Sequence, residues 1–180
     1  MNEVIQPMKK VLLSWLLFTM ANSQVSAQSK KEQLTKDSQE AKAEFIKTDP
    51  KMGGLFSKAY GYVILPNVGK GAIGVGGASG NGIAYERGKT VGTARMTQVS
   101  IGFQLGGQAY REVIFFEAKK DMDRFKENRV EFSAQVSAVA ATAGASANAK
   151  YVDGVMVFTM QKGGLMYEAS VGGQKFKYEK

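Results

Sequence analysis

Histidine and cysteine, which form many catalytic and metal centres, are both absent from the 180-residue sequence. Their absence excludes Ser-His and Cys-His nucleophilic systems and the usual zinc sites. Asp121 and Asp123 could suggest an acid and a base, but side chains two positions apart on a helix diverge. Ser57 and Lys58 are adjacent and lack a third group to orient them. The sequence therefore predicts no catalytic residue, no metal ligand and no cofactor, and a protein that is not an enzyme.

Residues 69–74 formally match GxGxxG, a pattern found at dinucleotide sites. More glycine and a hairpin signal follow, not a helix whose N-terminus could hold a pyrophosphate, and no acidic residue comes about 20 positions later. The P-loop pattern also fails, because Lys70 is followed by Gly71 and not by Ser or Thr. Two interpretations stay open. The segment is either a bend with a solvated lysine or a backbone anion nest, in which Gly69, Gly71 and Lys70 hold a lipid phosphate.

Basic residues are the remaining candidates for chemistry, since the formal net charge is +8. A basic domain suits anionic surfaces, above all phospholipid headgroups. The candidate headgroup-binding residues lie near the glycine bend, at an expected hairpin tip and on an expected helix over 118–128: Lys70, Arg87, Lys89, Lys119, Lys120, Arg124 and Lys126. The four on the helix form the densest basic cluster, which is either an ordinary solvated face or a phosphate-binding surface.

The elements that must position these residues start with a glycine-dense β-region. Over residues 97–105 the apolar side chains Val99, Ile101, Phe103 and Leu105 fall on one face and polar or glycine residues on the other. This period of two is typical of a half-buried antiparallel strand. Together with the segments before it, it predicts that residues 70–105 form a meander and not a βαβ unit.

Turns in this region are predicted from proline, asparagine and glycine. Residues 62–65 form a short apolar strand, which Pro66 should end with a turn around Asn67. Residues 79–82 contain an Asn-Gly pair and residues 87–88 an Arg-Gly pair. Both are expected to form hairpin turns, because glycine and asparagine adopt positive φ most readily.

The C-terminal part of the chain supplies the sheet centre and its last edge. Glu112 and Glu117 enclose a continuous apolar strand that belongs at the centre of the sheet. The helix over 118–128 should point Met122 and Phe125 inward. The small side chains of 140–149 either lie where another backbone approaches closely or form a flap beside a cavity. Further strands are expected at 130–138, 155–160 and 165–171, and Phe176 and Tyr178 should close the last edge.

The N-terminal segment reads as a leader followed by helices. Residues 1–27 have basic residues, an apolar run shorter than the roughly 20 residues of a spanning helix, and a small-residue cleavage pattern, which predicts a signal peptide. Residues 28–48 are expected to form an amphipathic helix, and a second should start at Asp49-Pro50, with Met52, Leu55, Phe56 and Ala59 facing inward. These helices are either a lid on the sheet or a membrane-contacting element.

The order of several motifs resembles the SYLF domain: residues 61–66, 68–71, the glycine run 74–82, residues 100–106, 113–116, Phe125, residues 162–166 and 170–173. The resemblance covers about residues 40–180, and the β-rich domain is placed at 49–180. It implies lipid binding, with phosphoinositide and actin-linked roles in eukaryotic members. The expected export of this chain points instead to bacterial anionic phospholipids, and makes actin an unlikely partner.

We therefore expect an α+β fold: a strongly twisted, mostly antiparallel sheet or partial barrel of about 7 to 9 short strands, covered by N-terminal helices and one short helix near 118–128. The expected function is reversible peripheral binding to anionic phospholipid through a basic face. The alternative is a structural or protein-interaction module of the cell envelope that pairs through open strand edges. Nucleic acid is not expected as a partner, and a lipoprotein is excluded by the lack of cysteine.

Overall fold

The computed structural model describes residues 28–73, 75–101, 108–128, 130, 138–162 and 171–180. The chain divides into two compact units, Met1–Leu34 and Thr35–Lys180, and all described strands lie in the second. Residues 28–48 are helical, as predicted. Within the described residues, no helix is both long and apolar enough to cross a membrane. The expected signal peptide at residues 1–27 lies outside the described residues.

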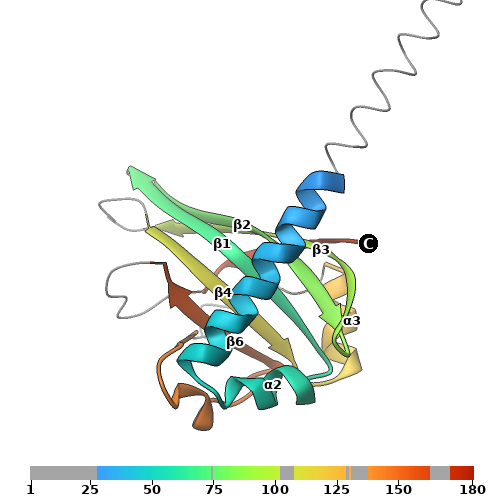
Figure 1. The fold of residues 1–180 in the computed structure, drawn as a ribbon. Coiled ribbons are helices and arrows are strands. Elements are labelled where there is room, and N and C mark those ends of the chain that lie inside the picture. Colours follow the sequence, from blue (N-terminus) through green and yellow to red (C-terminus); the bar gives the residue numbers. More distant parts are fainter. Residues whose placement is uncertain (1–27, 74, 102–107, 129, 131–137, 163–170) are drawn as a thin grey trace, which may run out of the picture. The chain divides into compact units, whose positions relative to one another are not determined.

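A seven-stranded sheet forms the body of the second unit (Figure 1). Its strand order is β5-β6-β4-β1-β2-β3-β7, and every pair is antiparallel except β5–β6. The elements that follow residues 28–48 are α2 (Met52–Lys58), β1 (Gly61–Ile73), β2 (Val75–Glu86), β3 (Lys89–Ile101), β4 (Gln108–Phe116), α3 (Lys119–Lys126), β5 (Val139–Ala140), the 3-10 helix η1 (Ala145–Ala147), β6 (Val155–Gln161) and β7 (Gln174–Glu179). The predicted α+β fold is confirmed, and the sheet is open.

The predicted meander is confirmed, although two of its turns are wrong. Arg87 and Gly88 form the β2–β3 hairpin with φ of 48° and 77°. Pro66 does not end β1, because the strand passes it at a register shift, where a missing N–H is tolerated. Residues 79–82 lie inside β2 and not in a turn. Glycine is needed there for close approach, since a Cβ on Gly82 would meet the carbonyl oxygen of Ile64.

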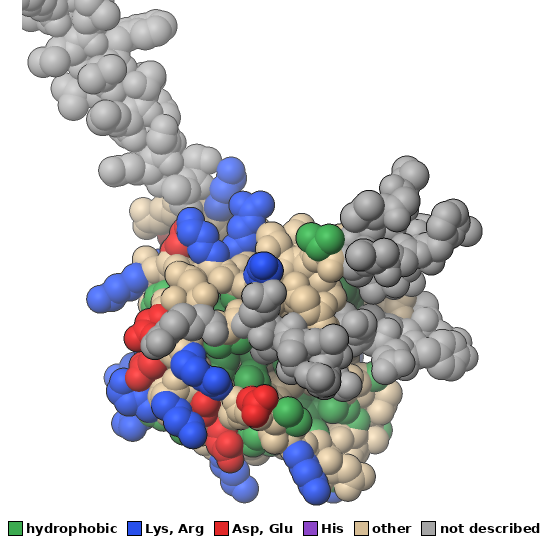
Figure 2. Space-filling view, turned by 180° about the vertical axis from the view of Figure 1, so that it is seen from behind, with side chains coloured by type: hydrophobic (Ala, Val, Ile, Leu, Met, Phe, Trp, Pro, Cys, Tyr) green, Lys and Arg blue, Asp and Glu red, His purple; other side chains and the backbone are tan. Residues whose placement is uncertain are grey.

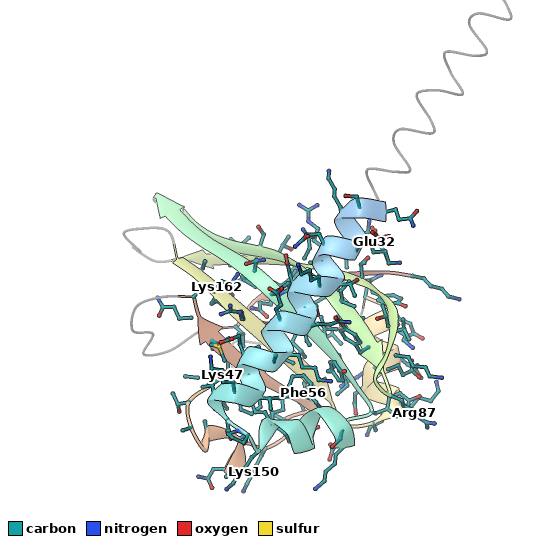
Figure 3. All side chains as sticks on the ribbon, in the orientation of Figure 1. Glu32, Lys47, Phe56, Arg87, Lys150 and Lys162 are labelled. Carbon is teal, nitrogen blue, oxygen red and sulfur yellow. The ribbon has the colours of Figure 1, made fainter. Side chains whose placement is uncertain are left out.

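Residues 35–48 and α2, which belong to the second unit, cover one face of the sheet, which favours the lid over a membrane-contacting role. Phe45, Met52 and Phe56 are buried, and Phe56 is labelled in Figure 3. The centre of its ring lies 5.1 Å from that of Tyr62 and 4.9 Å from that of Phe115. These apolar stripes are therefore used in packing against β1 and β4. α2 begins at Met52, two residues later than predicted.

Asp49 holds a neighbouring segment instead of capping a helix that starts at Pro50. Its carboxylate accepts hydrogen bonds from the N–H groups of Lys51 (3.1 Å) and Ser146 (2.8 Å). Burial raises the pKa of Asp49, but the Ser146 and Lys51 hydrogen bonds more than offset this, so the pKa lies below its ordinary value. The contact with η1 ties residues 145–147 to the segment before α2, while most of residues 140–149 are exposed or half-buried.

The other face of the sheet, here called the inner face, is closed by α3. Met122 and Phe125 point inward as predicted, both fully buried. The Phe125 ring lies 5.1 Å from Phe116 of β4 and 5.8 Å from Phe176 of β7. Since β4 and β7 are separated by three strands in the sheet, the sheet curls so that they meet across the core. This curl corresponds to the predicted partial barrel, and Phe176 lies on the last edge strand as expected.

The apolar alternation at the end of β3 faces opposite to the expected side. Val99 is 72% exposed, whereas Gln98 is 4% exposed and donates to the Gly172 carbonyl at 2.8 Å. Gln98 shares the inner face with the buried residues Ala94 and Met96, so the alternation set earlier in β3 buries Gln98 and exposes Val99. Most of the predicted strands at 130–138 and 165–171 lies outside the described residues.

Candidate functional site

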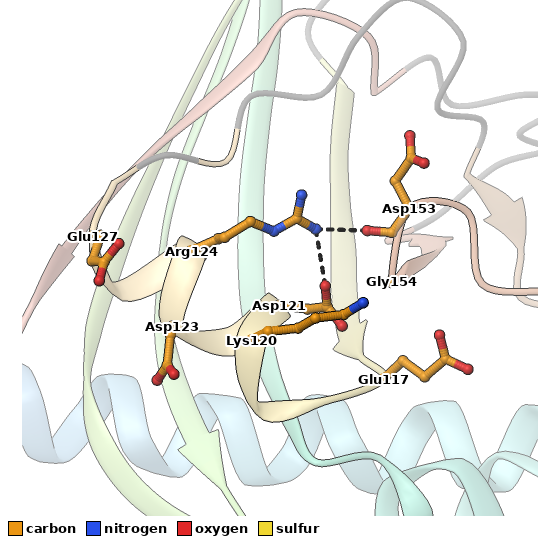
Figure 4. A pocket seen from close by; sticks show the side chains of 8 residues that line it. All are labelled: Glu117, Lys120, Asp121, Asp123, Arg124, Glu127, Asp153 and Gly154. Atoms are coloured by element: carbon orange, nitrogen blue, oxygen red, sulfur yellow. Dashed lines mark hydrogen bonds and ion pairs between the residues drawn. The ribbon is translucent and has the colours of Figure 1, made fainter.

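A polar groove of about 770 Å³ lies between α3 and the turn before β6 (Figure 4). Its lining contains more carboxylates than cations: Glu117, Lys120, Asp121, Asp123, Arg124, Glu127, Asp153 and Gly154. Among the residues that the structure describes, no group of three or more His, Cys, Asp or Glu is placed to hold a metal ion. The excess of carboxylates also makes the groove unsuitable for an anion.

One ion pair builds this groove. Asp121 is 2% exposed, accepts a hydrogen bond from the Ala118 N–H at 3.2 Å and pairs with Arg124 at 3.0 Å. Arg124 also donates to the Asp153 carbonyl at 2.7 Å. Gly154 has φ of 78°, and a Cβ there would collide with the Asp121 carboxylate. The arrangement fixes α3 to the β6 turn, which is a structural role.

The predicted basic cluster of α3 is largely neutralised by carboxylates. Lys119 pairs with Asp123 at 2.6 Å, and Lys126 pairs with Glu86 of β2. Together with Arg124, three of the four predicted cations therefore have an acidic partner. Basic and acidic side chains are correspondingly interspersed on the face seen in Figure 2. Lys120 is exposed and has no ion pair within the described residues.

The β2–β3 hairpin brings two further predicted cations to the same end of the sheet. Arg87 and Lys89 are exposed, and the Arg87 guanidinium lies 5.2 Å from the centre of the Tyr60 ring (Figure 3). Tyr60 donates to Glu86 at 2.6 Å. The hydrogen bond from Lys126, followed by that from Tyr60, lowers the pKa of Glu86. This network joins the hairpin to α3 through Lys126, whereas Lys120 lines the carboxylate-rich groove. Arg87 and Lys89 are therefore the predicted cations that the hairpin presents together.

The predicted anion nest is corrected by the strand pairing. Gly69 pairs with Ser79 on one side and Ala109 on the other, and Gly71 pairs with Gly77. These glycines lie within paired strands, where backbone N–H groups donate to carbonyl groups of the neighbouring strands. They therefore do not form a bend that cradles a phosphate. The Lys70 side chain lies outside the described residues.

A buried polar group on the inner face was missed by the sequence reasoning. We call it the Glu112 cluster, after its central carboxyl, and its members come from β4, β6 and β7: Tyr110, Glu112, Thr159, Gln161 and Gln174. Glu112 is fully buried, and Gln174 Nε2 donates to its Oε2 at 2.9 Å. The alternation of Tyr110, Glu112, Ile114 and Phe116 was the available signal, because it places Glu112 on a core-facing side.

Burial controls the ionisation of this cluster. Desolvation raises the pKa of Glu112 from 4.5 to about 7, although the Gln174 hydrogen bond opposes the shift. Desolvation, followed by the charge of Glu112, raises the pKa of Tyr110, so the phenol stays neutral. Glu112 is consequently the group of the cluster that titrates near neutral pH.

The described residues form an α+β domain with a curled, mostly antiparallel sheet, a helical lid and a basic hairpin end. Residues 97–180 match a family model described as Ysc84, Las17-binding protein actin regulator. The chain is also similar to beta cell expansion factor A of Aeromonas veronii, with 32% identity over 128 residues, which is 70% of the chain. The chain spans about half (48%) of that protein's length. The match to this family, the SYLF (Ysc84) family, confirms over residues 97–180 the resemblance found in the sequence.

Proposed function

We propose that the domain binds reversibly to anionic phospholipid surfaces through the end of the sheet that carries the β2–β3 hairpin. The observation that carries this proposal is that Arg87 and Lys89 are exposed and free of ion pairs among the described residues. Each Lys or Arg near an anionic membrane contributes about 1 kcal/mol of attraction. Lys119, Arg124 and Lys126 contribute less in this proposal, because carboxylates already balance their charges.

The geometry of the hairpin suits such a contact. The left-handed backbone at Arg87 and Gly88 makes a tight turn, so both neighbouring cations project from one tip. The turn is anchored by the hydrogen bond of the Arg87 N–H to the Tyr60 carbonyl at 3.0 Å. A fixed tip loses little conformational entropy when it meets a surface.

Export and a non-enzymatic role belong to the same proposal. Residues 1–27 would direct the chain out of the cytoplasm, which gives it access to envelope phospholipid and separates it from actin. The family description names actin regulation, but the matched relative is bacterial. For this reason phospholipid, and not actin, is the proposed partner.

Co-sedimentation of the full chain with anionic and zwitterionic vesicles tests the proposal. We expect binding to anionic vesicles that decreases as salt increases. The double variant Arg87→Gln/Lys89→Gln should lower the partition coefficient about 30-fold, which is about 1 kcal/mol for each charge. A matched control, Lys36→Gln/Lys47→Gln on the lid helix, removes the same charge and should keep binding. Equal losses in both variants would mean that total charge matters and the hairpin end does not.

One observation favours the alternative of an envelope protein-interaction module. Val99, near the C-terminal end of β3, is a large apolar side chain with 72% of its surface exposed. An apolar side chain that is exposed in the free protein can be buried in the centre of an interface when a partner protein covers it. Failure to bind either kind of vesicle would move this alternative to first place, with Val99→Glu as the variant that should then reduce partner binding.

A further inference from the structure

The Glu112 cluster contains buried oxygen atoms without hydrogen-bond partners among the described residues. They come from three strands and share the inner face: Glu112 Oε1, Thr159 Oγ1, Gln161 Oε1 and Gln174 Oε1. Glu112 lies directly across from Thr159, and Tyr110 directly across from Gln161, in the β4–β6 ladder. Side chains at such positions are within about 5.5 Å of each other at Cβ. The hydrogen bond to Gln174 then brings β7 to the same place.

The chemistry of these atoms defines the partner that they lack. When Glu112 is ionised, three of them are carboxylate or amide oxygens, which only accept hydrogen bonds, and the Thr159 hydroxyl can supply one donor. Buried polar atoms in native proteins are nearly always satisfied, and unsatisfied ones often mark a bound water or ion. A carboxylate beside several acceptor oxygens therefore requires a positively charged or donor-rich partner.

Charge balance decides between classes of partner. No described ion pair reaches Glu112, and its titratable neighbour, Tyr110, is neutral. One buried carboxylate is neutralised by a single positive charge, whereas a divalent ion would leave a net charge in a desolvated site. All-oxygen surroundings suit hard cations. This agrees with the lack, within the described part of the chain, of the multiple carboxylates that divalent ions prefer.

We propose that the Glu112 cluster binds a small monovalent cation, held by the carboxylate of Glu112 and the neutral oxygens of Thr159, Gln161 and Gln174. An alkali metal ion and the primary ammonium group of a small ligand share this chemistry. Binding displaces the proton of Glu112, so affinity falls about tenfold for each pH unit below the titration of that carboxyl.

Thermal unfolding of the full chain, without vesicles, tests the proposal. At about pH 8 and constant ionic strength, sodium, potassium or methylammonium should raise the Tm relative to N-methylglucamine, a cation too large for the site. The increase should grow with concentration and disappear near about pH 5.5. Stabilisation by methylammonium alone would assign the site to amines, and stabilisation by alkali ions alone would assign it to metal ions. Equal Tm values in all four salts at about pH 8 would overturn the proposal.

Variants separate this site from general salt effects. Glu112→Gln keeps the shape and should abolish the cation dependence, while Glu117→Gln, an exposed carboxylate in the groove, should retain it. Thr159→Val removes the hydroxyl of another member of the cluster and keeps the shape of that side chain. It should weaken cation affinity several-fold, which preserves the test if the first variant does not fold. Broadening of the sodium NMR signal by wild type at about pH 8, reversed by potassium, is the direct readout. Equal broadening by wild type and the folded Glu112→Gln variant would contradict the assignment.

Discussion

Replacing Glu112 with glutamine should make the stability of the domain much less dependent on pH. An acid whose pKa is higher in the folded state holds its proton more tightly there, so stability is lost as pH rises. The loss begins near pH 4.5, where the unfolded chain ionises, and is complete just above about pH 7, where the folded chain ionises too. Because one pKa unit corresponds to about 1.4 kcal/mol, the full loss is about 3 kcal/mol.

The difference between wild type and variant isolates this one group. Asp49 and Glu86 have lowered pKa values, so their contributions are present at higher pH and are lost as pH falls. These terms are common to both proteins and cancel in the comparison. The glutamine side chain introduced in the variant can still accept the hydrogen bond from Gln174, and its amide nitrogen can donate to the acceptor oxygens around it.

Urea unfolding between about pH 4.5 and pH 8, with N-methylglucamine as the buffer cation, measures the effect. From the low to the high end of this pH range, the free energy of unfolding of the variant should increase by about 3 kcal/mol relative to that of wild type. The denaturant slope should change little. Glu117→Gln, which removes an exposed carboxylate, should follow wild type. Parallel pH profiles for wild type and Glu112→Gln would refute the reasoning, because they would show that Glu112 titrates normally in the folded protein.

Three further substitutions test the packing around the candidate site. Gly154→Ala should cost about 1–3 kcal/mol, because the residue has positive φ and the new Cβ meets the Asp121 carboxylate; an unchanged Tm would contradict this account of the turn. Phe125→Ala should cost about 3–5 kcal/mol in urea unfolding, since its fully buried ring joins β4 to β7, and a cost below about 1 kcal/mol would mean that the curl is held elsewhere. Asp49→Asn should cost about 1 kcal/mol at about pH 7 and nearly nothing at about pH 2, because it weakens a charge-assisted bond to Ser146; a pH-independent cost would assign the effect to shape.

Local sequence patterns correctly predicted the elements in which the apolar side chains are also the buried ones. The apolar run Val113–Phe116 was placed at the sheet centre, and Met122 and Phe125 were placed inside α3, because period and polarity both identify their faces. Arg87-Gly88 was recognised as a turn because glycine there adopts positive φ at no steric cost. By contrast, Asn81-Gly82 carries the same turn signal but lies within β2, where close backbone approach requires glycine.

Long-range contacts account for what the sequence could not provide. Alternation predicted the period of residues 97–101 correctly, but the face that packs on the core is the one that carries Met96, so Gln98 is buried and Val99 is exposed. Lys126 was correctly seen as a basic residue, but its partner Glu86 is 40 positions away. Glu112 and Gln174 are 62 positions apart, so the Glu112 cluster forms only when β7 closes across the inner face.

The two proposed interactions respond differently to salt, which allows one preparation to test both. Lipid binding through Arg87 and Lys89 depends on screening, and screening is set by ionic strength whatever the monovalent cation. Filling of the Glu112 cluster depends on the identity of the cation at fixed ionic strength, because a large cation cannot enter a buried site. Exchanging potassium for N-methylglucamine at constant ionic strength should therefore shift the Tm and leave the vesicle-bound fraction unchanged. A bound fraction that follows the Tm would mean that the Glu112 cluster controls the membrane-binding surface, and the hairpin end could no longer be treated as an independent site.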